Sequence, residues 1–502
     1  MKKALTAAAA ASVLILAGCA SSESEPVAVT PAPVLDSANG AEYTGVAALS
    51  VASNCTGTVI DTGVDSAPAY VLTNGHCLGM DGQGPNEILI DEEGYGEATF
   101  FAFHDTPESD QVIVEVVRYE YATMYSVDLG VLRLDATLGE LKDQGIKALP
   151  IEPAGAKAGT KVANISYPVD GLETEDWALR EGNCKLGKQT DVIEFRWLWH
   201  DEIANDCPGV LGGSSGSPLI ANGKVVSMIN TTSGGVSAER GKACYLGQPC
   251  QLDGDKVKFV QDTAYGVDLN GVAECFPNGV FTLGEGCSLP SNVTPGVWGG
   301  GTYSADGTDT ADQPATISLT PPGEDAVTYL VKTGLASPES CMNEGFFDDA
   351  QEYTVAAGDS ETIDVTLPEK EGFEFACVGS KGADPAILIF NVDTTPPAEG
   401  PQLAITRFDD GGVSIDPLFD MPEIVDIQWL TGPPDSTDCA DRDLYQPYFR
   451  QALMVAANEL PLRVCAVGFD LAGNESPVTD QVVTADGEEG AGGEEESSGG
   501  SD

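Results

Sequence analysis

Short stretches of alternating apolar and polar residues, separated by turn-forming residues, run from residue 43 to about residue 235. Val, Ile, Leu and aromatic side chains with a period of two predict β-strands, and many short strands at regular spacing are typical of sandwiches or barrels. We expect strands at 46–51, 57–60, 70–72, 112–117, 129–134, 161–165, 192–197, 218–220 and 225–229. Residues 236–290 add a strand at 263–269 and are assigned to the same domain, 43–290.

The C-terminal part contains an internal repeat. Thr333-Gly334 precedes Cys341 at the spacing with which Thr431-Gly432 precedes Cys439, and the sequence around Cys377 is similar to that around Cys465. Each copy has the size and the short strands of an immunoglobulin-like or fibronectin-like sandwich. We therefore expect an all-β chain with two β-sandwich modules, 291–397 and 398–485, which space the first domain or bind its targets.

The N-terminus has the features of an export signal. Two lysines precede an apolar run that is too short to span a bilayer, so residues 1–18 are predicted to be a signal peptide. The run ends in Leu-Ala-Gly-Cys, which resembles the lipobox of bacterial lipoproteins and implies a lipid on Cys19. The alternative is an ordinary signal peptide with an incidental cysteine. Residues 19–42 read as a flexible tether and 486–502 as a disordered acidic tail.

Length and charge narrow the function further. With 502 residues, three domains are expected, and 42% hydrophobic residues exclude wholesale disorder. The net charge of -55 repels phosphate backbones, which excludes nucleic-acid binding as a main function. The resemblance to lipoproteins implies attachment to a membrane through the lipid, with the outer membrane or cell surface as the expected location and a periplasmic face as the alternative.

The cysteine count fits an oxidising compartment, since the 13 cysteines without Cys19 leave an even number. Connectivity cannot be deduced from sequence. Nearest neighbours within each module would be Cys55 with Cys77, Cys184 with Cys207, Cys244 with Cys250, Cys275 with Cys287, Cys341 with Cys377, and Cys439 with Cys465. With no CxxC pair and three histidines, a zinc cluster is disfavoured, and we expect neither a metal nor a cofactor.

Three motifs occur in the order His, Asp, Ser. His76 lies in Thr-Asn-Gly-His-Cys after a strand, Asp128 opens an apolar strand, and Ser215 lies in Gly-Gly-Ser-Ser-Gly-Ser-Pro. Together they resemble the trypsin-like serine peptidases of the chymotrypsin fold, whose catalytic triad has this order on two six-stranded β-barrels. The resemblance covers residues 43–235 and extends to the cysteine pair beside His76.

The resemblance implies a role for each residue. Ser215 attacks a carbonyl, His76 takes its proton, and Asp128 holds the other ring nitrogen. The amides of Gly213 and Ser215 form the oxyanion hole.

Digestive enzymes of this family have an Asp before the nucleophile, paired with an amine that zymogen cleavage creates, whereas this chain has Ser214. We therefore expect activity without proteolytic activation.

The substrate pocket is less readable. Its base maps to Gly209 and its wall to Asn230, Thr231 and Thr232, which suggests a small or apolar substrate side chain rather than Lys or Arg.

The sequence therefore predicts a lipid-anchored serine endopeptidase that acts on proteins or peptides. The rival interpretation is an inactive peptidase-like lipoprotein whose sandwiches serve adhesion or envelope binding. A lipase or esterase is disfavoured because the chain lacks the strand-to-helix nucleophile elbow. The oligomeric state stays open.

Overall fold

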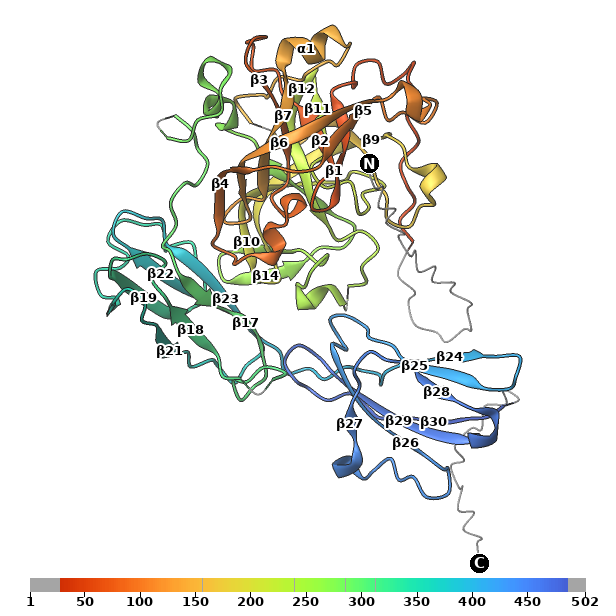
Figure 1. Ribbon diagram of the computed structural model, residues 1–502. Helices are drawn as coiled ribbons and strands as arrows, with labels where there is room; N and C mark the ends of the chain where they lie inside the picture. The colour runs from red at the N-terminus through yellow and green to blue at the C-terminus, as the bar shows by residue number, and fades with distance from the viewer. Residues whose placement is uncertain (1–27, 156, 239, 285, 312, 486–502) are drawn as a thin grey trace, which may run out of the picture.

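Two rings of antiparallel strands make up the N-terminal half of the computed structural model, which describes residues 28–485 except 156, 239, 285 and 312 (Figure 1). The predicted signal peptide, Cys19 and the acidic tail lie outside the described residues. Within 28–485, apart from the four omitted positions, no helix is long and apolar enough to cross a bilayer.

The first ring runs β1-β2-β3-β7-β6-β5 and is closed by the pairing of β5 with β1. Strand β4 pairs with β6 and extends the sheet at one edge. A capping box at Thr137 and Glu140 begins the short helix that follows β7. The elements are β1 (Val46–Ser50), β2 (Asn54–Val59), β3 (Pro68–Thr73), β4 (Ile88–Glu93), β5 (Glu97–Phe100), β6 (Val112–Thr123), β7 (Leu129–Thr137) and α1 (Leu138–Asp143).

The second ring runs β8-β9-β10-β15-β12-β11 and is closed by the pairing of β8 with β11, with β13 and β14 added beside β9. The elements are β8 (Lys161–Ser166), β9 (Arg180–Glu194), β10 (Trp197–Asn205), β11 (Pro218–Ala221), β12 (Lys224–Thr232), β13 (Cys250–Asp253), β14 (Lys256–Phe259) and β15 (Ala264–Asp268). The two six-stranded rings are the expected double barrel.

One predicted strand is wrong. Residues 192–197 were expected to form a single strand, but β9 ends at Glu194 and β10 begins at Trp197. Phe195 adopts a positive φ of 55° and, with Arg196, makes a two-residue turn that pairs Glu194 with Trp197. Such turns join antiparallel strands directly. Trp197 and Trp199 share a face of β10 and stack in the core, as their spacing indicates.

Two sandwich-like modules follow (Figure 1). In each, a three-stranded sheet accompanies a larger one, five-stranded in the first module and four-stranded in the second. The first contains β16 (Val297–Gly299), β17 (Gly301–Tyr303), β18 (Thr316–Leu319), β19 (Val327–Leu335), β20 (Gln351–Val355), β21 (Glu361–Asp364), β22 (Gly372–Ser380) and β23 (Ala386–Val392). The second contains β24 (Leu403–Arg407), β25 (Val413–Pro417), β26 (Asp426–Gly432), β27 (Gln446–Pro447), β28 (Leu453–Val455), β29 (Leu462–Phe469) and β30 (Thr479–Val483).

All six cysteine pairs join nearest neighbours within one module, and they are the pairs expected from the sequence. Short 3-10 helices occupy several connections, at His76–Leu78, Met80–Gly82, Glu108–Asp110, Thr174–Asp176, Arg240–Ala243, Val272–Cys275, Pro277–Gly279, Arg442–Leu444 and Ala457–Glu459.

The described part of the predicted tether is packed on the barrels, which corrects the expectation for residues 28–42. The amide of Leu35 donates to Leu179 O at 2.8 Å, and the amide of Glu181 donates to Pro33 O at 3.0 Å. The guanidinium of Arg180 donates to Ala32 O at 2.8 Å. The Leu35 side chain enters the core between the barrels. We call residues 28–35 the N-terminal strap.

The strap yields a stability prediction. Replacing Leu35, which is 3% exposed, by Ala removes buried methyl groups and leaves a cavity, so we expect a loss of about 2–4 kcal/mol in unfolding free energy. Chemical denaturation of the full chain measures it. Val34→Ala is the matched control because this neighbour is 39% exposed, and it should change stability by less than about 0.5 kcal/mol. Equal, small effects at both positions would mean that the strap is a tether.

Candidate active site

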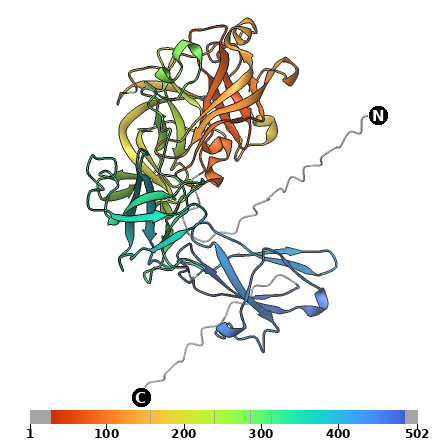
Figure 2. The same cartoon turned by 60° about the vertical axis from the view of Figure 1, so that its left-hand side comes forward.

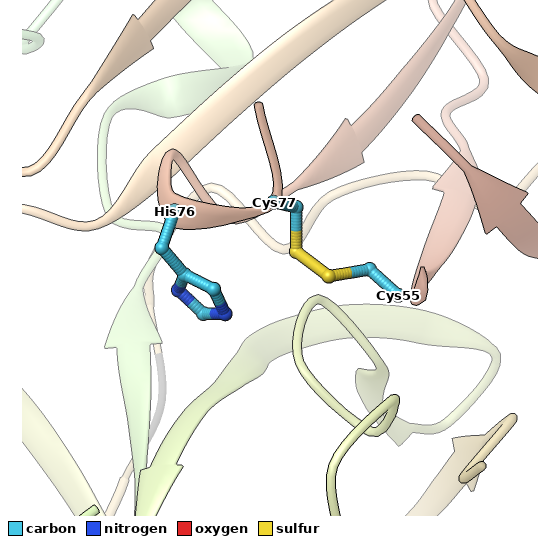
Figure 3. A group of neighbouring side chains, drawn as sticks. All are labelled: Cys55, His76 and Cys77. Carbon is cyan, nitrogen blue, oxygen red and sulfur yellow. A yellow bond between two sulfur atoms is a disulfide. The ribbon is translucent and has the colours of Figure 1, made fainter. Parts of the chain in front are cut away.

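His76 lies in a tight turn directly after β3. The turn passes so close to the end of β6 that a Cβ on Gly75 would lie 2.0 Å from Thr123 O, so glycine is required there. The buried Asn74 amide donates to Asp128 O at 2.9 Å. Cys77 forms a disulfide with Cys55 of β2, and the imidazole of His76 lies beside it (Figure 3). The backbone that carries His76 is thus fixed on both sides.

Asp128 is fully buried one residue before β7, and both of its carboxylate oxygens bind His76. Oδ2 lies 2.6 Å from Nδ1 of the ring, and Oδ1 accepts the backbone amide of His76 at 3.0 Å. A carboxylate in this position favours the tautomer with a proton on Nδ1 and leaves Nε2 as the basic nitrogen.

The pKa of His76 is raised above its usual value of 6.5. Burial acts to lower this pKa, but the charge and hydrogen bond of Asp128 oppose burial, and Glu194 and Asp81 add to the same effect. The ring is 25% exposed, so a substrate can reach it.

Ser215 lies on a loop that is bound to the same part of the first barrel. Its carbonyl accepts the amide of Thr56 at 2.8 Å, and the Thr56 hydroxyl donates to Gly213 O at 2.8 Å. Thr56 follows Cys55, whose disulfide leads to Cys77 and His76, so Ser215 and His76 flank one disulfide. Within the described residues, the Ser215 hydroxyl makes no hydrogen bond to His76. Such bonds are often long in enzymes without substrate.

The turn before Ser215 contains backbone amides that have no acceptor among the described residues. Ser214 is fully buried and closes the turn on itself: its amide donates to Leu211 O at 2.9 Å, and its hydroxyl accepts the Leu211 amide at 3.2 Å. Gly213 has a φ of 96°, which favours glycine. The amides of Gly213 and Ser215 donate to none of the described residues, as donors reserved for a developing negative charge would.

Comparison with known proteins agrees with this geometry. Residues 55–228 match the family model described as the trypsin-like peptidase domain. This chain contains a trypsin-like peptidase domain. The match begins at Cys55 and includes all three motif residues. No curated protein matches the chain.

Similar solved structures include a thermostable serine protease, AL20, from an extremophilic microorganism, at 14% identity and a TM-score of 0.30 over 46% of this chain and 93% of that one. A mutant of human heparin binding protein (CAP37) matches at 13% identity and a TM-score of 0.29 over 47% of this chain and 90% of that one.

Two buried glutamates, which the sequence analysis missed, lie close to His76 and Asp128. Glu194 accepts the Thr231 hydroxyl at 2.5 Å and the Gly247 amide at 3.0 Å, and Glu202 accepts the Asn230 side-chain amide at 3.2 Å. Burial raises the pKa of Glu194 and raises that of Glu202 well above its usual value. Their signal in the sequence is an acidic residue beside apolar ones, since Glu194 follows Val192 and Ile193 in β9 and Glu202 precedes Ile203 in β10.

The predicted pocket residues do not all face open space. A Cβ on Gly209, whose φ is 69°, would lie 2.2 Å from the amide nitrogen of Ala32 in the strap. Asn230 is buried and turned toward Glu202, whereas Thr231 and Thr232 are partly exposed. The preference for a small or apolar substrate side chain stays a prediction.

Cys55, His76 and Cys77 come within ligand distance of one another, and so do Cys439, Cys465 and Asp480. In both groups the sulfurs are joined in a disulfide and are not thiolates, which are the form that binds metals. Figure 3 shows the disulfide of the first group. These groups therefore do not fit a metal site.

The charge of Glu194 gives a prediction for His76. Replacing Glu194 by Gln removes an anion that favours the imidazolium, so the pKa of His76 should fall from a wild-type value above 6.5. NMR titration of the full chain measures it, with His76→Ala to assign the signal among three histidines. Glu175→Gln, which alters an exposed carboxylate that is not among the charges acting on His76, should leave the pKa unchanged. An unchanged pKa in Glu194→Gln would contradict the arrangement.

Proposed function

We propose that this chain is an exported, lipid-anchored serine endopeptidase that cleaves peptide bonds with Ser215, His76 and Asp128. The observation that carries the proposal is the pair of hydrogen bonds between Asp128 and His76. Oδ2 lies 2.6 Å from the ring Nδ1, and Oδ1 lies 3.0 Å from the backbone nitrogen. A structural histidine needs only one hydrogen-bond partner for its ring. Here the two oxygens of Asp128 bind the ring and the backbone of the same histidine, which fixes both the orientation and the tautomer of the ring. The free amides of Gly213 and Ser215 support the same function.

The reaction follows from these positions. Ser215 Oγ forms a bond to the substrate carbonyl carbon while its proton passes to His76 Nε2, and the carbonyl oxygen becomes an anion that Gly213 and Ser215 stabilise through their amides. The C–N bond then breaks as His76 gives the proton to the leaving amine. Water repeats the sequence on the acyl-enzyme and releases the acid and Ser215.

We also propose that the enzyme needs no zymogen cleavage. Ser214 completes its hydrogen bonds within its own turn, so this turn needs no buried ion pair with a new N-terminal amine. The strap supports the same loop from outside, because Ala32 packs against Gly209 and binds Arg180. In an uncut chain, the strap therefore already contacts Gly209, in the loop that leads to the amides of Gly213 and Ser215.

The lipid anchor rests on sequence alone. Cys19 in the lipobox-like motif would attach the enzyme to a membrane, with the outer membrane or cell surface as the proposed location. Ala32, whose carbonyl accepts the Arg180 guanidinium, is only 13 positions after Cys19, so the peptidase domain would act close to that membrane.

A fluorophosphonate probe tests catalysis against the inactive-lipoprotein alternative. We expect covalent labelling of the wild type, none of Ser215→Ala, and a rate about 10⁴-fold lower in Asp128→Asn, which loses the correct tautomer. Ser109→Ala, at an exposed position, is the control and should label normally. A folded wild-type protein that takes no label would support the binding lipoprotein instead.

Zymogen independence is tested by the mass of the labelled species. We expect probe-labelled protein to retain the complete strap, because the strap packs on the Gly209 loop without being cut. Intact-mass spectrometry of the labelled wild type decides this. Labelled molecules that all begin within residues 28–35, together with unlabelled uncut chain, would contradict the proposal.

A further inference from the structure

Met124–Ser126, at the start of the connection from β6 to β7 that leads to Asp128, are held by two different domains. On the barrel side, the Trp199 indole donates to Met124 O at 3.1 Å, and the amide of His200 donates to Ser126 O at 2.9 Å. Ser126 has a φ of 64°, so the chain turns sharply just before the triad carboxylate. We call this segment the pre-Asp segment.

On the other side, the first sandwich holds the middle residue of the pre-Asp segment. Tyr125 is 3% exposed, and its ring is part of the sandwich core with Val297, Leu388 and other residues of that module. Its hydroxyl donates to Pro385 O at 2.8 Å, directly before β23. A tyrosine that buries its ring and satisfies its hydroxyl in a neighbouring domain is an anchor between the domains.

The contact extends well beyond this tyrosine. Ile193 and Leu198, on the β9–β10 hairpin, share one buried cluster with Phe375 and Ile389 of the sandwich. The amide of Ile387 donates to Asn86 Oδ1 at 3.1 Å. Both views place the first sandwich directly against the peptidase domain (Figures 1 and 2). A shared apolar core distinguishes this contact from the polar interfaces of independently moving domains.

We propose that the first sandwich is part of the catalytic unit and that Tyr125 is a positioning residue for Asp128. This inference rests on the proposed function, since Asp128 acts there through His76. The pre-Asp segment keeps its path because the sandwich holds Tyr125 and β10 holds its neighbours. When the sandwich side loosens, the segment shifts and the carboxylate three residues along moves away from the imidazole. The sandwich is therefore neither a spacer nor only a target-binding module.

Tyr125→Phe in the full chain tests this proposal, with Tyr329→Phe as the matched control. Tyr329 is a fully buried tyrosine of the same sandwich core, and its hydroxyl donates to Pro295 O at 3.1 Å. Each variant loses one hydroxyl bound to a proline carbonyl, so their melting temperatures should fall alike. Only Tyr125 adjoins the triad.

We expect Tyr125→Phe to lower the rate of fluorophosphonate labelling about 3- to 10-fold, a modest part of what a 1 Å misplacement costs. The pKa of His76, measured by NMR, should also fall, because Asp128 raises it and burial lowers it. Tyr329→Phe should change neither.

Wild-type labelling rate and His76 pKa in Tyr125→Phe, or equal changes in both variants, would overturn the proposal. The pKa readout separates this result from failure of the proposed function. A wild type that takes no label but whose His76 pKa responds to Tyr125→Phe alone would reject the peptidase activity and keep the positioning role.

Discussion

The bond between the buried carboxylate of Asp128 and His76 is the constraint on which the rest of the site depends. A carboxylate without solvent needs donors for both oxygens, and here one residue supplies both, through its ring and its backbone amide. The backbone contact requires the turn at Gly75, and the ring contact requires the start of β7 at a fixed place. The disulfide to Cys55 and the amide of Thr56 then bring the Ser215 loop to the same place.

The two buried glutamates near this site, Glu194 and Glu202, differ in how many of their carboxylate oxygens accept a hydrogen bond. Glu202 accepts a bond from Asn230 through one oxygen, while its other oxygen has no partner among the described residues. Burial then favours the neutral acid, which is why its pKa rises so far. Glu194 has donors on both oxygens and lies close enough to raise the pKa of His76. The negative charge that matters to the imidazole thus comes from named neighbours and not from the net charge of the surface, which solvent screens.

The sequence predicted what local chemistry determines. The barrels and the motif residues could be predicted because their signals are local. Strands with a period of two, turns with glycines and neighbouring cysteine pairs can each be recognised in a short stretch of sequence. The strap could not, because its hydrogen bonds are made by its own backbone and its side chains follow no apolar period, so that Pro31 and Pro33 read as a linker. Glu202 and Tyr125 were missed because their partners lie on other strands or in another domain. The prediction of a single strand over Val192–Trp197 was wrong because the two-residue turn at Phe195 and Arg196 contains no glycine to mark it.

Two elements outside the recognised motifs therefore hold loops of the site from opposite directions. The strap, residues 28–35, packs on Gly209 upstream of Gly213 and Ser215, and the first sandwich holds Tyr125 upstream of Asp128. The family model matches residues 55–228, and both elements lie outside this range. A β-barrel keeps its strands in register by its own hydrogen bonds, but its connecting loops have no such ladder and need support from elsewhere. Because those loops carry Asp128 and Ser215, which we propose as members of the triad, the smallest unit that defines the proposed site extends from the strap to the end of the first sandwich.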